Sequence, residues 1–144
     1  MPAGASGAPL LELRGVARTY VEGDRTRRVL DRIDLTVHEG EIVVLLGRSG
    51  SGKSTLLNLI GGLDAPDDGE VRIGGRPIHT MSERERTLYR RRRVGFVFQF
   101  FNLVPTLSVL ENVLLPSDLD GRAGKDRRAK AMELLDAVGL ADRA

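Results

Sequence analysis

The chain has 144 residues, of which 41% are hydrophobic and 29% charged, values that fit one ordinary folded domain or part of a larger one. The formal net charge of +2 is too small to indicate nucleic-acid binding by itself, and the absence of cysteine excludes disulfides, thiolate chemistry and a zinc cluster. The longest apolar stretch, 42–46, is far shorter than the roughly 20 residues that span a bilayer, so any membrane role is expected to come through a partner.

Two strands are predicted at the start of the chain. Residues 1–9 are rich in Ala, Gly and Pro and lack a basic start and an apolar run, which indicates a disordered leader rather than a signal peptide; the folded part is assigned to 10–144. Residues 10–21 are typical of a strand with a bulge at Gly15, and a polar turn follows. Apolar and polar residues alternate over 29–37, which predicts a half-exposed antiparallel strand.

A buried strand, a glycine-rich loop and a helix are expected next. The continuous apolar run 42–46 is typical of a strand that is buried on both faces of a parallel sheet. After the loop, a helix is predicted over 53–63, and Gly61 and Gly62 mark its end. The side chains expected to face inward are those of Leu56, Leu57, Leu59 and Ile60.

A short hairpin and a basic helix come after that. Residues 71–73 lead through two glycines to 77–78, which predicts two short strands that return to the first β unit. The sequence Ser-Glu-Arg-Glu at 82–85 is a capping box, and the helix that it opens is expected to run to about Arg92. The four arginines 90–93 are interpreted as a solvated helix end; nucleic-acid binding is the alternative, but a reader motif and interleaved aromatic residues are missing.

The last third of the chain is predicted to contain one more core strand and two helices. Residues 94–99 are typical of a strand that ends at Gln99. A second capping box at 108–111 starts a short helix that is expected to stop by Pro116. A final helix is predicted over 125–138 and closed by a glycine. Its apolar residues at helical spacing are Ala129, Met132, Leu135 and Val138, and the closing glycine is Gly139.

The glycine-rich loop carries the pattern Gly-x4-Gly-Lys-Ser, which is typical of a phosphate-binding P-loop. Backbone N–H groups of 50–55 can point inward around a β-phosphate, and glycines are needed because a Cβ would block that approach. Lys53 supplies a point charge toward the β- and γ-phosphates, and the Ser54 hydroxyl can bind Mg²⁺. The predicted phosphate-binding residues are Gly47, Arg48, Ser49, Gly50, Ser51, Gly52, Lys53, Ser54 and Thr55.

Three segments together give the chain a specific resemblance. The P-loop, the sequence Val-Gly-Phe-Val-Phe-Gln at 94–99 and the sequence Asn-Leu-Val-Pro-Thr-Leu-Ser-Val at 102–109 resemble the ATP-binding subunits of ABC transporters, from about Leu10 to the end of the chain. The stretch 81–103 and the segment 111–113 are similar to the lipoprotein-releasing and macrolide-export subgroup. The resemblance implies an α/β fold: a RecA-like P-loop NTPase core with an N-terminal antiparallel β subdomain, incomplete at the C-terminus.

The resemblance also assigns roles outside the P-loop. Gln99 matches the Q-loop glutamine, which is expected to contact Mg²⁺ or the attacking water; a polar residue that merely ends a strand is the alternative. Tyr20 matches the A-loop aromatic residue that stacks on adenine, and packing at a strand end is the alternative. Four apolar residues follow Gln99 where the family forms a groove for the permease, and an ordinary core cluster is the alternative. They are Phe100, Phe101, Leu103 and Val104.

Other parts of the family's catalytic site have no counterpart in the sequence. Hydrolysis in the family also needs an aspartate that holds Mg²⁺ through water and a glutamate directly after it. Asp136 lies on a predicted helix and is followed by Ala137, so it does not fit that role. The signature motif and the switch histidine are missing too, since His38 and His79 lie in turns on either side of the P-loop. A C-terminally truncated subunit that binds Mg-ATP weakly and does not hydrolyse it alone is therefore expected.

The resemblance implies a membrane transporter as the setting of this ATP site. In the full-length form, two ATP-binding subunits are expected to pair as a homodimer and to drive a transmembrane permease subunit from the cytoplasmic face of the cell membrane, without a nucleic-acid partner. Two alternatives stay open: a stand-alone P-loop kinase or GTPase, and a nucleotide-binding fragment or non-transport ABC ATPase without turnover. The chain has no Asn/Thr-Lys-x-Asp segment to recognise guanine, and β-rich sequence precedes its P-loop, which argues against the first alternative.

Overall fold

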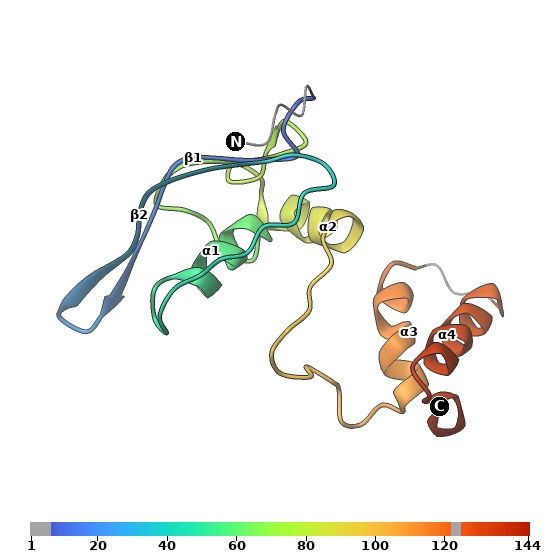
Figure 1. Ribbon diagram of the computed structural model, residues 1–144. Coiled ribbons are helices and arrows are strands. Elements are labelled where there is room, and N and C mark those ends of the chain that lie inside the picture. The colour runs from blue at the N-terminus through green and yellow to red at the C-terminus, as the bar shows by residue number, and fades with distance from the viewer. Residues whose placement is uncertain (1–6, 122–124) are drawn as a thin grey trace. The chain divides into compact units, whose positions relative to one another are not determined.

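The computed structural model describes residues 7–121 and 125–144. The chain divides into two compact units, residues 1–94 and residues 95–144. Among the described residues, the first unit contains a four-stranded sheet and two α-helices, and the second contains two α-helices and a short 3-10 helix (Figure 1). The leader predicted over 1–9 falls mostly outside the described residues.

A long antiparallel hairpin opens the first unit. Strand β1 spans Leu11–Glu22, β2 spans Arg25–Val37, and a tight turn joins them. The register between the two strands shifts around Gly15, where φ is +57°, a conformation that favours glycine. The predicted strands, the turn and the bulge are confirmed, and both strands extend beyond the predicted limits.

Two short strands complete the sheet. β3 (Asp68–Ile73) pairs with β1, and β4 (Arg76–Pro77) pairs with β3, which gives the antiparallel order β2-β1-β3-β4. The predicted hairpin is therefore confirmed. The start of β3 passes very close to β1, because a Cβ built on Gly69 would lie 2.5 Å from the backbone of Arg14 and of Gly15. No side chain fits at Gly69 unless the strands move apart.

The core of the first unit lies between the sheet and helix α1 (Lys53–Ile60), which Figure 1 shows packed against the sheet. Leu56 and Leu59 are buried as predicted, but Leu57 is 54% exposed, so the prediction that it faces inward is wrong. One step around the helix from Leu56 carries its side chain out of the apolar face. The buried residues of this core are Leu13, Val16, Leu30, Leu56, Leu59, Val71 and Ile78.

Helix α2 (Glu83–Arg93) begins at the predicted capping box. The Ser82 side chain accepts a hydrogen bond from the Glu85 N–H, and the Glu85 carboxylate accepts one from the Ser82 N–H. Three of the four arginines at its end are exposed, as predicted. Arg90 is not a solvated residue: its guanidinium donates to the Gly62 carbonyl and so ties α2 to the turn after α1.

The two runs predicted as core strands, 42–46 and 94–99, are not strands in the structure. Both are irregular segments without a strand partner among the described residues. Their composition suits burial on both faces, but Ile42, Val44 and Leu46 are 93%, 71% and 89% exposed. A parallel strand receives its hydrogen bonds and its burial from neighbours that are distant in sequence. Without those neighbours, an apolar sequence alone does not produce a strand.

Helix α3 (Val109–Leu119) opens the regular part of the second unit and runs past the predicted stop. Its capping box is as predicted, with reciprocal hydrogen bonds between Ser108 and Glu111. Pro116 lies inside the helix rather than at its end, so that prediction is wrong. Proline removes one backbone hydrogen bond, but its fixed φ suits a helix. Leu114, in the turn before it, packs against the core of the second unit.

Helix α4 (Lys125–Ala137) packs against α3, and a 3-10 helix, η1 (Ala141–Arg143), follows. The predicted closing glycine is confirmed: Gly139 has φ of +71°, and the two N–H groups after the helix bond back to it in a Schellman arrangement. Of the four apolar residues at helical spacing, Leu135 is buried and Met132 is half-buried, whereas Ala129 and Val138 are exposed. The buried residues of this small core are Leu110, Ala131 and Leu135.

Candidate nucleotide-binding site

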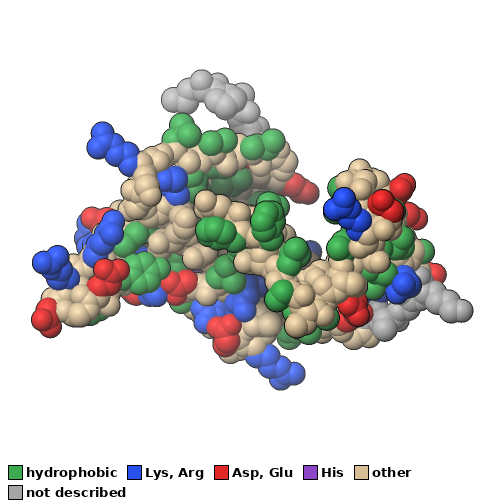
Figure 2. All heavy atoms as spheres, turned by 90° about the horizontal axis from the view of Figure 1, so that it is seen from below, with side chains coloured by type: hydrophobic (Ala, Val, Ile, Leu, Met, Phe, Trp, Pro, Cys, Tyr) green, Lys and Arg blue, Asp and Glu red, His purple; other side chains and the backbone are tan. Residues whose placement is uncertain are grey.

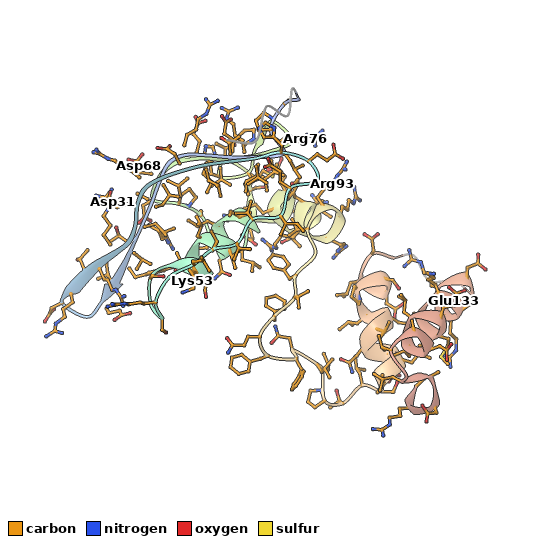
Figure 3. All side chains as sticks on the ribbon, in the orientation of Figure 1. Asp31, Lys53, Asp68, Arg76, Arg93 and Glu133 are labelled. Atoms are coloured by element: carbon orange, nitrogen blue, oxygen red, sulfur yellow. The ribbon has the colours of Figure 1, made fainter. Side chains whose placement is uncertain are left out.

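The P-loop lies directly before α1 and leaves the start of that helix open. Gly52 is the N-cap, with φ of +89° and no side-chain cap, and Figure 3 shows Lys53 at this end of α1. The first N–H groups of a helix have no partner within the helix, and together with the helix dipole they favour an anion. The first turn contains no acidic residue that would compete for them. The loop therefore presents free donors to a phosphate.

Steric limits explain why glycine is required at position 52. A Cβ built there would lie 2.9 Å from the Val29 carbonyl oxygen and 3.0 Å from a methyl group of Leu30, both on β2. The positive φ would strain any other residue in addition. Close packing of Gly52 against β2 thus fixes the P-loop to the sheet.

Lys53 folds back over the loop that precedes it. Its ammonium donates to the carbonyl oxygens of Gly47 and Arg48, each at 2.8 Å, and to the Ser51 hydroxyl at 3.3 Å. Its partners are uncharged oxygens, so the ammonium charge is not neutralised by a carboxylate in any described contact. An arriving phosphate would offer the same ammonium a charged acceptor, which makes a stronger hydrogen bond.

A cavity of about 570 Å³ opens above this loop, and β1 and β2 form its other wall. Tyr20, at the end of β1, is part of that wall, so the structure brings the predicted base-stacking residue and the predicted phosphate-binding loop to one cavity. The P-loop residues that line the cavity are Ser49, Gly50, Gly52, Lys53, Ser54 and Thr55. A cavity with a ring on one side and helix N–H groups on the other suits a nucleotide.

The cavity also contains residues that the motifs do not reveal. Glu22, Arg27 and Val29 line it, and the Arg27 guanidinium donates to the Gly50 carbonyl at 3.0 Å. Arg27 lies directly opposite Tyr20 in the hairpin register. Directly opposed residues of an antiparallel pair point to the same face. Pairing the two predicted strands across their turn was the sequence signal that could have identified Arg27.

The residues predicted after the P-loop belong to the second unit. Gln99 follows an irregular segment and is exposed, and it is not among the residues that line the cavity. Phe100 and Phe101 are 76% and 92% exposed, so the alternative of an ordinary core cluster is wrong for them. Leu103 and Val104 line an apolar groove of about 570 Å³ that residues of α3 and of the end of α4 complete. Figure 2 shows that hydrophobic side chains reach the surface.

The described residues contain no cluster of metal-binding side chains around either histidine. Among residues 7–121 and 125–144, no group of three or more His, Asp or Glu side chains is placed to hold a metal ion. His79 lies beside β3, where its Nδ1 is 3.2 Å from both the N and the O of Val71. His38 lies in the turn after β2. For Mg²⁺, the cavity lining includes the predicted ligand Ser54, and Glu22, Ser49 and Thr55 also have side-chain oxygens there.

The fold and the cavity define the class of this chain: it is an α/β protein of the P-loop NTPase type, with an antiparallel β subdomain whose strands β1 and β2 precede the loop. The comparisons with known proteins are more specific. Residues 30–144 match the ABC transporter family. The chain belongs to that family.

The relatives agree with the subgroup predicted from the sequence. The chain is 51% identical to an uncharacterized ABC transporter ATP-binding protein of Mycobacterium tuberculosis (strain ATCC 25618 / H37Rv), over 94% of this chain and 54% of the relative. It is 44% identical to the lipoprotein-releasing system ATP-binding protein LolD of Xanthomonas campestris pv. campestris (strain 8004), over 95% of this chain and 57% of the relative. It is 47% identical to the macrolide export ATP-binding/permease protein MacB of Sodalis glossinidius (strain morsitans), over 92% of this chain and 20% of the relative.

A solved structure supports the fold as well. The ATP-binding cassette MJ0796, in a dimeric post-hydrolysis state bound to ADP and Pi, superposes with a TM-score of 0.81 and 44% sequence identity, over 88% of this chain and 56% of that one. The predicted family and fold class are confirmed, and a stand-alone kinase or GTPase is excluded. The chain spans about half the length of the ATP-binding relatives that it matches. None of the helices in the described residues is long and apolar enough to span a membrane.

Proposed function

We propose that this chain binds Mg-ATP and acts as part of the ATP-binding subunit of an ABC transporter, where it couples ATP to a membrane permease. One observation carries the proposal: Tyr20 and the open N-terminus of α1 face the same cavity. An adenine and a chain of phosphates have these two needs, a flat apolar partner at one end and N–H donors at the other.

The chain's own residues divide the work of binding. Backbone N–H groups of 50–55 surround the β-phosphate, and Lys53 leaves its carbonyl partners to contact the β- and γ-phosphates. Ser54 would hold Mg²⁺, and a bound Mg²⁺ would supply positive charge to offset that of the phosphates. Gln99, which matches the Q-loop glutamine of the family, stays a predicted ligand of Mg²⁺. Tyr20 stacks on the base.

We further propose that the 144-residue chain binds ATP without hydrolysing it. The sequence contains no aspartate–glutamate pair after an apolar strand and no signature motif, and Asp136 lies on α4 rather than at the end of a strand. ATP binding needs only the P-loop and the Tyr20 ring that stacks on the base. Hydrolysis also needs a group that orients the attacking water.

The proposed partners are a transmembrane permease subunit and a second ATP-binding subunit. One relative is named as an ATP-binding/permease protein, and the solved relative is dimeric, which supports both partners. The apolar groove beside Leu103 and Val104 supports a protein contact on the second unit. Such a subunit would lie on the cytoplasmic face of the membrane. A non-transport ABC protein is the second candidate, and copurification with nucleic acid instead of a membrane protein would favour it.

The test compares two lysines in one titration experiment. Lys53→Met should weaken ATP binding by about 10- to 100-fold, because charge-assisted hydrogen bonds contribute roughly 1.5–3 kcal/mol. Lys130→Met, which removes an exposed lysine paired with Glu133 on α4, should leave ATP affinity unchanged. Equal affinity of the Lys53→Met protein and the original chain would refute the proposed site. Phosphate release by the chain alone at a normal ABC-ATPase rate would refute the proposed lack of turnover.

A further inference from the structure

The ring of Tyr20 is held by an ionic network that the nucleotide motifs do not include. We propose that Arg18 and Asp64 are positioning residues, which hold the Tyr20 ring at the correct angle and depth for an adenine base. The inference rests on the proposed function, in which Tyr20 stacks on ATP. It assigns a role to two residues that do not line the cavity themselves.

The first contact is between the two side chains of β1. Arg18 and Tyr20 are two residues apart on the strand, at a point where its register with β2 is irregular. The central carbon of the Arg18 guanidinium lies 5.0 Å from the centroid of the Tyr20 ring. A cation at this distance from a ring face is attracted by the π electrons. Arg18 therefore occupies one face of the ring, while Tyr20 also forms part of the cavity wall.

The second contact fixes the other end of the ring. The Tyr20 hydroxyl donates to the Asp64 carboxylate at 3.2 Å, and the Arg18 guanidinium donates to the same carboxylate at 2.9 Å. The Arg18 and Asp64 side chains are 21% and 30% exposed, so water only partly screens their ion pair. Cation, ring and carboxylate form a closed triangle. Rotation of the ring would break at least one of its sides.

The third contact ties the strand itself to the same turn. Asp67 accepts hydrogen bonds from the Arg18 guanidinium and from the Thr19 N–H, each at 2.6 Å. The Asp67 N–H in turn donates to the Ala17 carbonyl at 3.0 Å. These contacts fix the backbone on the N-terminal side of Tyr20. Arg18 thus has two carboxylate partners, and its guanidinium has little freedom to move away from the ring.

The network joins the two halves of the proposed ATP site. Asp64 and Asp67 lie in the turn that follows α1, and the opposite end of α1 carries the P-loop. One short helix therefore connects the phosphate-binding loop to the carboxylates that hold Tyr20. This arrangement keeps a constant distance between the Tyr20 ring and the P-loop. Positioning of this kind saves the free energy that ordering a mobile ring would cost on binding.

A purely structural role is the competing explanation, since the same ion pairs also connect β1 to the turn. The two roles differ in which ligand they affect. A positioning residue for Tyr20 should matter for a ligand with a base and not for a ligand without one. Loss of fold stability should weaken the binding of both ligands to the same extent.

The experiment therefore compares Mg-ATP with magnesium tripolyphosphate on variants of the full 144-residue chain. Tyr89→Phe is the background, because the chain has two tyrosines and no tryptophan, and Tyr20 then becomes the only tyrosine whose emission can report stacking. Arg18→Met should weaken ATP binding about fivefold to tenfold, leave tripolyphosphate binding within about twofold, and reduce the quenching of Tyr20 by ATP. Asp64→Asn should act in the same direction with a smaller effect.

Two controls separate positioning from general damage. Arg72→Met removes an arginine whose ion pair with Glu70 lies elsewhere in the same sheet. This substitution should change the affinity for neither ligand. In a Tyr20→Ala chain, Arg18→Met should cause no further loss of ATP affinity, because there is no ring left to position. Circular dichroism shows whether each variant is folded, and Asp64→Asn provides the test if Arg18→Met is not.

The possible results give distinct answers. Equal losses for ATP and tripolyphosphate, no loss for either, or an undiminished Arg18→Met effect in the Tyr20→Ala chain would each overturn the positioning role. If the background chain binds tripolyphosphate as tightly as ATP, Tyr20 does not stack on the base, and both the positioning role and that part of the proposed function fail. If it binds neither ligand, the proposed ATP site itself is refuted.

Discussion

The two units of this chain differ in how completely each buries its apolar residues. The sheet unit, 1–94, has seven buried residues in one core, drawn from the sheet, from α1 and from Ile78 just after β4. Among its described residues, the helical unit, 95–144, buries three in its core. Both units leave large apolar side chains exposed: Ile42, Val44 and Leu46 in the sheet unit, and Val97, Phe100 and Phe101 in the helical unit. Buried apolar area is the main source of stability. The sheet unit should therefore be the more stable of the two.

The difference follows from where the backbone hydrogen-bonding groups of each segment find their partners. The hairpin β1–β2 pairs two stretches that are adjacent in sequence, so a local turn is sufficient to form it. The runs 42–46 and 94–99 instead have the composition of parallel strands, which pair only with distant segments. Their exposure shows that local sequence supports the β subdomain much better than it supports the core strands.

The largest expected effect compares the two cores directly. Leu59→Ala should destabilise the sheet unit by about 3 kcal/mol, because Leu59 is 1% exposed and truncation would leave a cavity. Leu135→Ala, in the helical unit, should reduce hydrogen-exchange protection only over 109–137. Urea unfolding followed by hydrogen exchange measures both effects.

The matched control for these substitutions is Leu57→Ala. It removes the same atoms from α1 at an exposed position, and it should cost less than about 0.5 kcal/mol. If Leu135→Ala lowered protection across β1 and β2 as well, the two units would unfold together. The contrast between a stable sheet unit and a weak helical unit would then be wrong.

The fold was predictable from the sequence wherever a local signal was sufficient. Both capping boxes, the bulge at Gly15 and the Gly139 helix end depend on contacts between residues close in the chain, and all of them are present. Tertiary packing decided the rest. Pro116 lies inside α3, which packs on α4, and the Arg90 guanidinium donates to the Gly62 carbonyl, 28 positions away.

The site was predictable to the same extent. The P-loop pattern was sufficient to locate the backbone N–H donors, because the loop and helix α1 are contiguous in sequence. Tyr20 was identified through the family resemblance, and the structure adds that it lines the same cavity as the P-loop. The contacts of Arg18 with Asp64 and Asp67 span more than 45 residues and carry no motif. Such contacts become visible only when the sheet and α1 are placed together.

A medium-sized effect concerns pH and the two helix caps. Hydrogen bonds from Ser82 lower the pKa of Glu85, and hydrogen bonds from Ser108 lower the pKa of Glu111. A carboxylate whose pKa is lower in the folded state stabilises the fold at pH values above its unfolded pKa, about 4.3, and that contribution is lost as the pH falls through the folded pKa. Both helix starts should therefore loosen in acid.

Separate substitutions test the two caps. Glu85→Gln should remove the acid-dependent step for α2, and Glu111→Gln should remove it for α3; segment-resolved hydrogen exchange between pH 3 and pH 7 measures both. Because α3 belongs to the less buried unit, its protection should be lost first. An earlier loss at α2 than at α3 would reverse the proposed order of stability.

The smallest expected effect concerns Arg27 and asks whether the sheet unit holds the nucleotide through more than its motifs. Arg27 connects β2 to the P-loop by a hydrogen bond to Gly50 and faces the cavity opposite Tyr20. Its positive charge is exposed, so solvent screens it. Arg27→Gln should weaken ATP binding about twofold to threefold, with a smaller loss at high salt.

Arg28→Gln is the matched control for this prediction. Arg28 is the next residue on β2, its ion pair is with Asp31, and its side chain projects from the opposite face of the strand. ATP titrations at two salt concentrations would show whether only Arg27 matters. Equal effects of the two substitutions would mean that general positive charge on the hairpin attracts the nucleotide. A specific effect of Arg27 would mean that β2, as well as Tyr20 and the P-loop, contributes a ligand to the cavity.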